Sequence, residues 1–149
     1  MLAQVLRPQG YAQYRARLSD FLGIAPDAND LEVHRAVNEG IPAMLLMALA
    51  EKGEIAPQER DQVIPLKTLK ARIDKQQALS QGESDRLFRI AHVRAMAETI
   101  FGDKDKARRW LSKPKTRFDG ASPASMLTTL QGCHLVEEML IQIAEGYAF

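Results

Sequence analysis

Glycine and proline divide the sequence into short segments, and none of these segments sustains the alternation of apolar and polar residues that a half-buried β-strand requires. β-Branched residues do not cluster into strand-like runs either. Most segments instead begin at a residue that can cap a helix and end at a glycine or before a proline. These boundaries predict an all-α fold.

The boundary residues also predict where each helix lies. Ser80 and Glu83 have the spacing of a capping box, so we expect a long helix to follow them. Asn29 or Asp30 can cap the second helix, and Asp103 can cap the short helix that follows the long one. The expected helices cover residues 11–22, 30–40, 43–51, 58–63, 66–75, 83–101, 103–111, 122–132 and 133–145, and residues 113–121 form a loop. Gly132 is expected to separate the last two helices, and the final helix is expected to expose Glu137 and Glu138.

The chain is long enough for one domain or for two small ones. With 149 residues, 46% of them hydrophobic, it can bury a core without disulfides. We expect two domains, residues 1–80 and 81–149, that meet on the long helix. A single cysteine, Cys133, rules out an internal disulfide and is typical of the cytoplasm. The longest apolar stretch, residues 41–50, contains Pro42 and is too short to span a membrane, so we expect a cytoplasmic protein with no membrane association.

Charge is distributed unevenly along the chain, although the net charge is only +1. Residues 18–59 carry eight acidic side chains against two basic ones, whereas residues 86–117 carry ten basic against three acidic. Residues 118–149 have four acidic side chains and no lysine or arginine. Such a pattern suits a protein with two different partners, and a solvated surface without partners explains it equally well.

Residues for catalysis or metal binding are sparse. The three histidines lack metal-ligand spacing, and the sequence has no glycine-rich phosphate-binding loop. Cys133 and His134 are adjacent, and neighbours on a helix point in different directions, so they do not form a catalytic dyad. We expect a buried thiol beside a surface imidazole, no catalytic activity, no metal site and no cofactor.

Two short helices separated by a tight joint, at residues 58–63 and 66–75, have the layout of a helix-turn-helix. Leu66, Leu69 and Ile73 form the apolar stripe of the second helix. The polar side chains off this stripe, suited to DNA bases and phosphates, are Lys67, Thr68, Lys70 and Arg72. Any surface helix shows a similar pattern, so the spacing leaves DNA binding open. The basic run of residues 104–115 could add phosphate contacts.

The last residues of the sequence include two aromatic side chains, Tyr147 and Phe149. Chain ends normally fray unless they are docked. The two rings therefore either pack on the protein's own core or fill a pocket of a partner.

The sequence from Gly82 onward resembles the toxin-binding domain of the Xre/MbcA/ParS antitoxin family. The residues that carry the resemblance are Glu83-Ser84-Asp85-Arg86-Leu87, Phe101-Gly102, Ala107, Trp110-Leu111, Pro114, Ser122-Pro123, Leu127, Gly132, Val136 and Glu145-Gly146. Upstream, Gly40-Ile41-Pro42-Ala43 and Pro65-Leu66-Lys67-Thr68-Leu69 resemble the Cro-type helix-turn-helix half of the same antitoxins. The resemblance implies an N-terminal Cro-like helix-turn-helix bundle followed by a small helical toxin-binding domain.

The resemblance also implies a function. Family members of this layout pair with a RES-domain toxin that consumes NAD, form homodimers and repress their own operon by binding its promoter DNA. For this chain it implies DNA contacts at Lys67, Thr68, Lys70 and Arg72, and toxin contacts at Glu145, Gly146, Tyr147 and Phe149. We expect dimerisation through the C-terminal helices. The alternatives are a stand-alone helix-turn-helix transcription regulator without a toxin partner and a protein-binding module that has lost DNA affinity.

Overall fold

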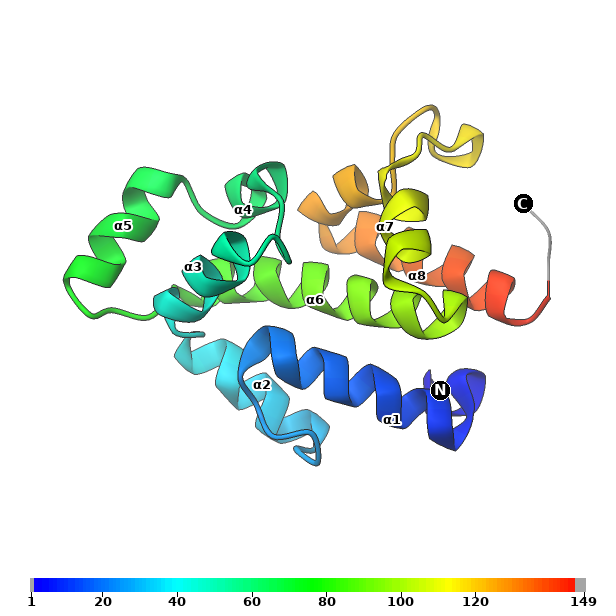
Figure 1. Ribbon diagram of the computed structural model, residues 1–149, viewed down its shortest axis with the longest axis horizontal. Helices are drawn as coiled ribbons and strands as arrows, with labels where there is room; N and C mark the ends of the chain where they lie inside the picture. The colour runs from blue at the N-terminus through cyan, green and yellow to red at the C-terminus, as the bar shows by residue number, and fades with distance from the viewer. Residues whose placement is uncertain (1, 147–149) are drawn as a thin grey trace. The chain divides into compact units, whose positions relative to one another are not determined.

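The structure is a computed structural model that describes residues 2–146 (Figure 1), with side chains described from residue 5 onward. Over this range the regular secondary structure is helical throughout, which confirms the expected all-α fold. The α-helices are α1 (Leu2–Leu22), α2 (Asp30–Glu39), α3 (Ala43–Glu51), α4 (Pro57–Val63), α5 (Leu66–Asp74), α6 (Gln81–Phe101), α7 (Lys104–Ser112) and α8 (Leu130–Ala144). Two short 3-10 helices, η1 (Thr116–Phe118) and η2 (Ala124–Thr128), lie between α7 and α8.

The chain forms two compact units whose boundaries lie inside α1 and α6. The central unit comprises Ser19–Phe88, and the terminal unit comprises Met1–Leu18 with Arg89–Phe149. The division of roles between residues 1–80 and 81–149 stays a prediction.

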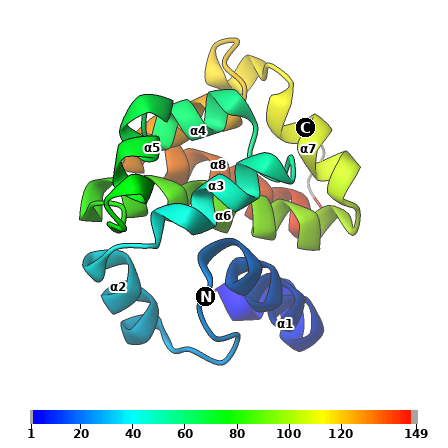
Figure 2. The same cartoon turned by 60° about the vertical axis from the view of Figure 1, so that its left-hand side comes forward.

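The core of the central unit is built by α3, α4 and α5, which group together in Figure 2. Its fully buried side chains include Ile41, Leu46 and Leu69. Gly40 ends α2 with a φ of 108°, and a Cβ there would lie 2.4 Å from the carbonyl oxygen of Leu79. Glycine is required at this point because residue 79 donates its backbone N–H to the carbonyl of Ile41 at 2.8 Å, which brings the two segments together.

In the terminal unit, a partly buried chain of polar side chains joins α1, α6 and α8. The Tyr14 hydroxyl lies 2.5 Å from Nδ1 of His92, and Nε2 of His92 lies 3.0 Å from Oε1 of Glu137. The expectation that Glu137 is exposed is wrong, because its carboxylate is half-buried against the imidazole. Burial raises the pKa of Glu137, but the hydrogen bond and charge of His92, with Cys133 and His134, outweigh it and hold the pKa below its ordinary value.

Several helix boundaries differ from the sequence expectation. The helix expected over residues 122–132 is wrong, because this segment forms the 3-10 helix η2 and its last residues belong to α8, and the loop expected over residues 113–121 contains the 3-10 helix η1. The first helix begins at Leu2, well before residue 11, and contains a break at Arg7, whose backbone is non-helical (φ 63°, ψ 166°) ahead of Pro8. Gly132 does not end a helix. It lies buried in the first turn of α8, where its N–H is donated to Oγ1 of Thr129 at 3.0 Å.

Candidate functional site

The joint between α4 and α5 is two residues long. Pro57 occupies the first turn of α4, and the Glu59 carboxylate accepts the backbone N–H of Ala56 at 3.0 Å. α4 ends at Val63 because the residue before a proline is driven out of the helical region, and Ile64 is extended (φ −161°, ψ 140°) ahead of Pro65. α5 then begins at Leu66, so only Ile64 and Pro65 separate the two helices.

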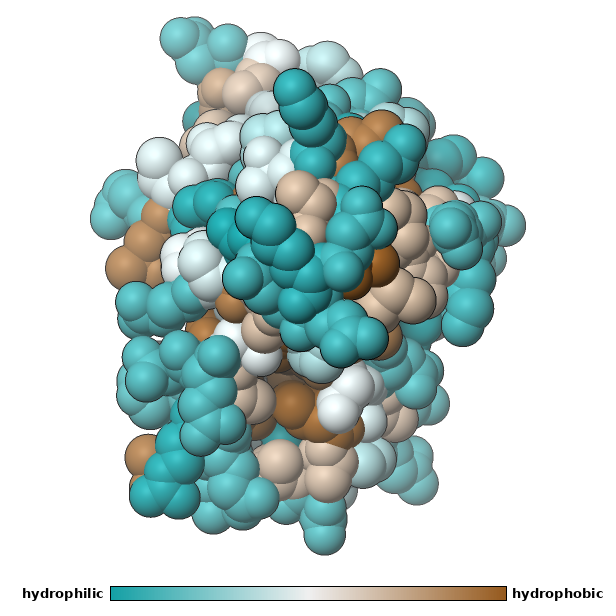
Figure 3. Space-filling view, turned by 90° about the vertical axis from the view of Figure 1, so that its left-hand side faces the viewer, coloured by the Kyte–Doolittle hydropathy of each residue, from teal (hydrophilic) through white to brown (hydrophobic). Residues whose placement is uncertain are grey.

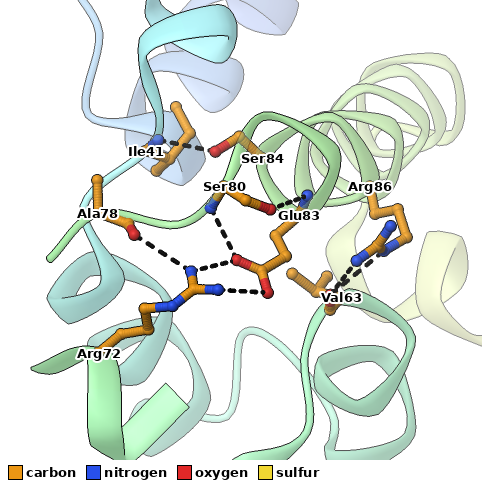
Figure 4. Close-up of polar contacts among 8 residues, drawn as sticks. All are labelled: Ile41, Val63, Arg72, Ala78, Ser80, Glu83, Ser84 and Arg86. Carbon is orange, nitrogen blue, oxygen red and sulfur yellow. Dashed lines mark hydrogen bonds and ion pairs between the residues drawn. The ribbon is translucent and has the colours of Figure 1, made fainter. Parts of the chain in front are cut away.

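Two arginines satisfy the carbonyl groups at this joint. Arg60 donates to the carbonyl of Ile64 at 2.8 Å. Arg86, from α6, donates from Nε and Nη2 to the carbonyl of Val63 at 3.2 and 3.0 Å (Figure 4). Since the last carbonyls of a helix have no partner within it, these bonds stabilise the end of α4 and hold the joint.

α5 has one buried face and one solvent face. Leu69 is fully buried and Ile73 is half-buried, as the apolar stripe predicts, but Leu66, the first residue of that stripe, is 39% exposed. Lys67, Thr68 and Lys70 are exposed, and Figure 3 shows hydrophilic side chains beside apolar ones on the side of the molecule on which α5 lies. These three side chains are therefore available to a ligand in solution. Their contact with DNA stays a prediction.

Arg72 differs from the other three predicted DNA contacts. Its Nη1 and Nη2 lie 2.5 and 3.2 Å from the two carboxylate oxygens of Glu83, and Nη1 also lies 3.3 Å from the carbonyl oxygen of Ala78 (Figure 4). Burial raises the pKa of Glu83, but the backbone hydrogen bond from Ser80 and the bonds to Arg72 outweigh it and hold the pKa below its ordinary value. The guanidinium is thus engaged within the protein.

The predicted capping box at the start of α6 is confirmed. The Ser80 N–H donates to Oε1 of Glu83 at 2.7 Å, and the Glu83 N–H donates to the Ser80 hydroxyl at 3.1 Å. The next residue, Ser84, is fully buried and accepts the backbone N–H of Ile41 at 2.8 Å. Sequence reasoning did not find this bond, because a serine in the first turn of a helix reads simply as a helix-start residue.

α7 presents a basic surface in the terminal unit. Asp103 caps the helix as predicted, accepting the N–H groups of residues 105 and 106. The exposed cations of this helix are Lys104, Lys106, Arg108 and Arg109. Trp110 packs at 5.7 Å from the ring of Phe101, with Nζ of Lys115 at 4.8 Å over the indole. Burial and the nearby charge of Lys113 lower the pKa of Lys115.

The predicted toxin-contact residues lie beyond the end of α8. Glu145 donates its backbone N–H to the carbonyl of Ile141, and both Glu145 and Gly146 are exposed. Tyr147 and Phe149 lie outside the described residues. On α8 itself, Cys133 is buried and His134 is exposed, as expected.

Between residues 2 and 146 the side chains form no group of three or more His, Cys, Asp or Glu that could hold a metal ion. In the same range, every helix is too short or too polar to cross a membrane.

Comparison with known proteins gives first the class and then the family. Residues 96–146 match the antitoxin Xre/MbcA/ParS C-terminal toxin-binding domain, so the chain is an antitoxin-type protein with a toxin partner. It is 58% identical over 147 residues to an antitoxin Xre of Pseudomonas putida, which covers 99% of this chain and 92% of that protein. An antitoxin Xre of Photorhabdus laumondii is 28% identical over 127 residues, which covers 81% of this chain and 84% of the relative. The chain belongs to the Xre antitoxin family.

The matched toxin-binding region begins at residue 96. The motif Glu83-Ser84-Asp85-Arg86-Leu87, which carries part of the sequence resemblance, therefore precedes it. The side chains of Glu83, Ser84 and Arg86 form hydrogen bonds with residues of the central unit.

Proposed function

We propose that this chain neutralises a RES-domain toxin that consumes NAD, and that as a homodimer it represses its own operon by binding promoter DNA. The observation that supports this proposal best is the 58% identity to an antitoxin Xre along nearly the whole chain, together with the match to a toxin-binding domain at residues 96–146. The chain acts by binding, in the cytoplasm, without catalysis or cofactor.

The end of the chain is the proposed toxin contact, formed by Glu145, Gly146, Tyr147 and Phe149. Residues 118–149 carry acidic side chains without any lysine or arginine. A cleft that admits an anionic nucleotide is electropositive, so an acidic segment with aromatic side chains is complementary to it in charge and can fill it. The exposure of Glu145 and Gly146 supports this proposal.

The proposed DNA contact is the solvent face of α5. Lys67, Thr68 and Lys70 are exposed within the first two turns of a helix that follows a two-residue joint. Lysine neutralises phosphates, and a hydroxyl can bond either a base or a phosphate. One such helix reads few base pairs, so a two-fold dimer that engages two half-sites is needed for specific binding.

α8 is the proposed dimer surface. Leu130 and Leu135 are 61% and 38% exposed there, although the same helix buries Val136 and Leu140. Large apolar side chains left in water on a helix that also forms the core favour association with another apolar surface.

The test is co-expression of this chain with the protein encoded beside its gene, followed by co-purification. The full chain is expected to retain the protein that is encoded beside its gene. A variant lacking residues 145–149 is expected to lose at least about tenfold in affinity for it. If this variant and the pair Tyr147→Ala and Phe149→Ala bind as tightly as the full chain, the toxin contact lies elsewhere.

The alternatives give different results in the same material. A stand-alone regulator shifts promoter DNA but does not retain the protein encoded beside its gene. A protein-binding module without DNA affinity retains that protein and leaves promoter DNA unshifted at moderate salt. Either result contradicts half of the proposal.

A further inference from the structure

One turn of α6 bonds to three different segments of the central unit (Figure 4). Ser84 accepts the backbone N–H of Ile41 at the entrance to α3. Arg86 donates to the carbonyl of Val63 at the end of α4. Glu83 binds Arg72 on α5. This turn therefore forms bonds at the start of α3, at the end of α4 and on α5, which are the three helices that build the core of the central unit.

The bond to α5 is the one that bears on the DNA surface. Oε1 of Glu83 accepts the Ser80 N–H at 2.7 Å and Nη1 of Arg72 at 2.5 Å, while Oε2 faces Nη2 at 3.2 Å. The side chains of Arg72 and Glu83 are 25% and 11% exposed. A fork-to-fork ion pair with little water around it has a defined geometry, which a lysine could not reproduce.

We propose that Arg72 is a positioning residue, whose guanidinium is held by Glu83 so that α5 keeps the orientation in which Lys67 and Lys70 meet DNA. This inference rests on the proposed DNA-binding function and reassigns Arg72, which the sequence pattern groups with the direct contacts. Arg72 lies on the flank of α5 between the solvent face and α6. To reach a phosphate it must release a buried carboxylate and leave that charge unpaired, which is unfavourable.

The two roles of Arg72 predict opposite effects for the same substitution. Glu83→Gln keeps an oxygen for the Ser80 N–H, so the capping box survives, but the ion pair is lost. If the pair positions α5, operator binding weakens. If Arg72 contacts DNA directly, Glu83→Gln frees its guanidinium and removes a competing negative charge, so binding strengthens.

The experiment measures affinity of the full-length variants for a duplex that covers the promoter upstream of the gene, and for a scrambled duplex, over a series of salt concentrations. Asp85→Asn is the matched control, because Asp85 is an exposed acid in the same turn and the substitution changes the charge equally. We expect Glu83→Gln to bind the promoter about tenfold more weakly than the control, with an unchanged salt slope and a reduced preference over the scrambled duplex.

Arg72→Lys gives a second, independent result. It retains a charge that can meet a phosphate, but it cannot span both carboxylate oxygens. We expect it to weaken promoter binding nearly as much as Glu83→Gln does. Affinity close to that of the unsubstituted chain, or tighter binding by Glu83→Gln than by Asp85→Asn, overturns the positioning role.

Amide hydrogen exchange without DNA separates this inference from the proposed function. In Glu83→Gln we expect faster exchange over residues 66–75 than in Asp85→Asn, because α5 is no longer held. If the unsubstituted chain does not prefer the promoter but exchange still rises, DNA binding fails while the positioning of α5 stands. If exchange over these residues is unchanged, the positioning fails.

Discussion

Substituting alanine for Gly132 tests the packing of η2 against α8. An ideal Cβ at Gly132 would lie 1.9 Å from the carbonyl oxygen and 2.9 Å from the carbonyl carbon of Met126. Both are backbone atoms, so no side chain can rotate aside, and the 3-10 helix itself must move.

The expected magnitude is the difference between two effects of opposite sign. Alanine is favoured over glycine inside a helix by about 1 kcal/mol. Overpacking of a tightly packed interior costs about 1–3 kcal/mol and sometimes more, and a contact with backbone belongs at the upper end of that range. With the cost near 3 kcal/mol and the gain near 1 kcal/mol, we expect Gly132→Ala to lower the free energy of unfolding by about 2 kcal/mol.

Gly82→Ala is the matched comparison. Gly82 also lies in the first turn of a helix, but a Cβ there meets only Nη1 of Arg86 at 3.6 Å, which is an ordinary contact. Helix propensity then acts alone, and we expect stabilisation of up to about 1 kcal/mol.

Urea unfolding of both variants is followed by far-ultraviolet circular dichroism. For Gly132→Ala it is also followed by the emission of Trp110, the only tryptophan in the sequence. If Gly132→Ala is as stable as the unsubstituted chain, or is stabilised like Gly82→Ala, the close approach of η2 and α8 is wrong.

Three further substitutions test other parts of the structure. Ser84→Ala leaves a buried backbone N–H without its acceptor and is expected to cost about 1–3 kcal/mol in urea unfolding, whereas Ser112→Ala, at an exposed serine, is expected to cost less than about 0.5 kcal/mol. Burial raises the pKa of Glu137, but the bond to His92 outweighs it and holds the pKa below its ordinary value, so the ionised carboxylate contributes stability above that ordinary pKa. This stability is lost as the pH falls through the folded-state pKa. Glu137→Gln should therefore lose less stability on acidification, and parallel acid-unfolding curves would contradict this. Lys67→Ala should weaken promoter binding and flatten its salt dependence by roughly one phosphate contact; an unchanged slope would remove Lys67 from the phosphate interface.

The features that sequence reasoning predicted well are local ones. The caps at Asn29, Ser80 and Asp103 involve residues two or three positions apart, so their spacing alone identifies them. The end of α4 is likewise predicted by a local effect, because the proline that follows Ile64 keeps Ile64 out of the helical conformation. Most helix boundaries are consequently visible in the sequence.

The features that sequence reasoning missed depend on contacts between distant residues. His92 and Tyr14 are 78 positions apart, and the spacing of neither residue indicates the other. Arg72 fits the pattern of a surface cation on α5, and only the position of Glu83 on another helix shows where its guanidinium is engaged. Gly132 likewise matches a helix break in sequence, although its role is to let Met126 approach.

The antitoxin function can be tested in cells by measuring NAD content and growth when the protein encoded beside this gene is induced, with and without this chain. We expect the neighbour alone to deplete NAD and stop growth, and co-expression of this chain to restore both. A neighbour that leaves NAD and growth unaffected, or that remains toxic with this chain in excess, would contradict the proposal that this chain neutralises an NAD-consuming toxin.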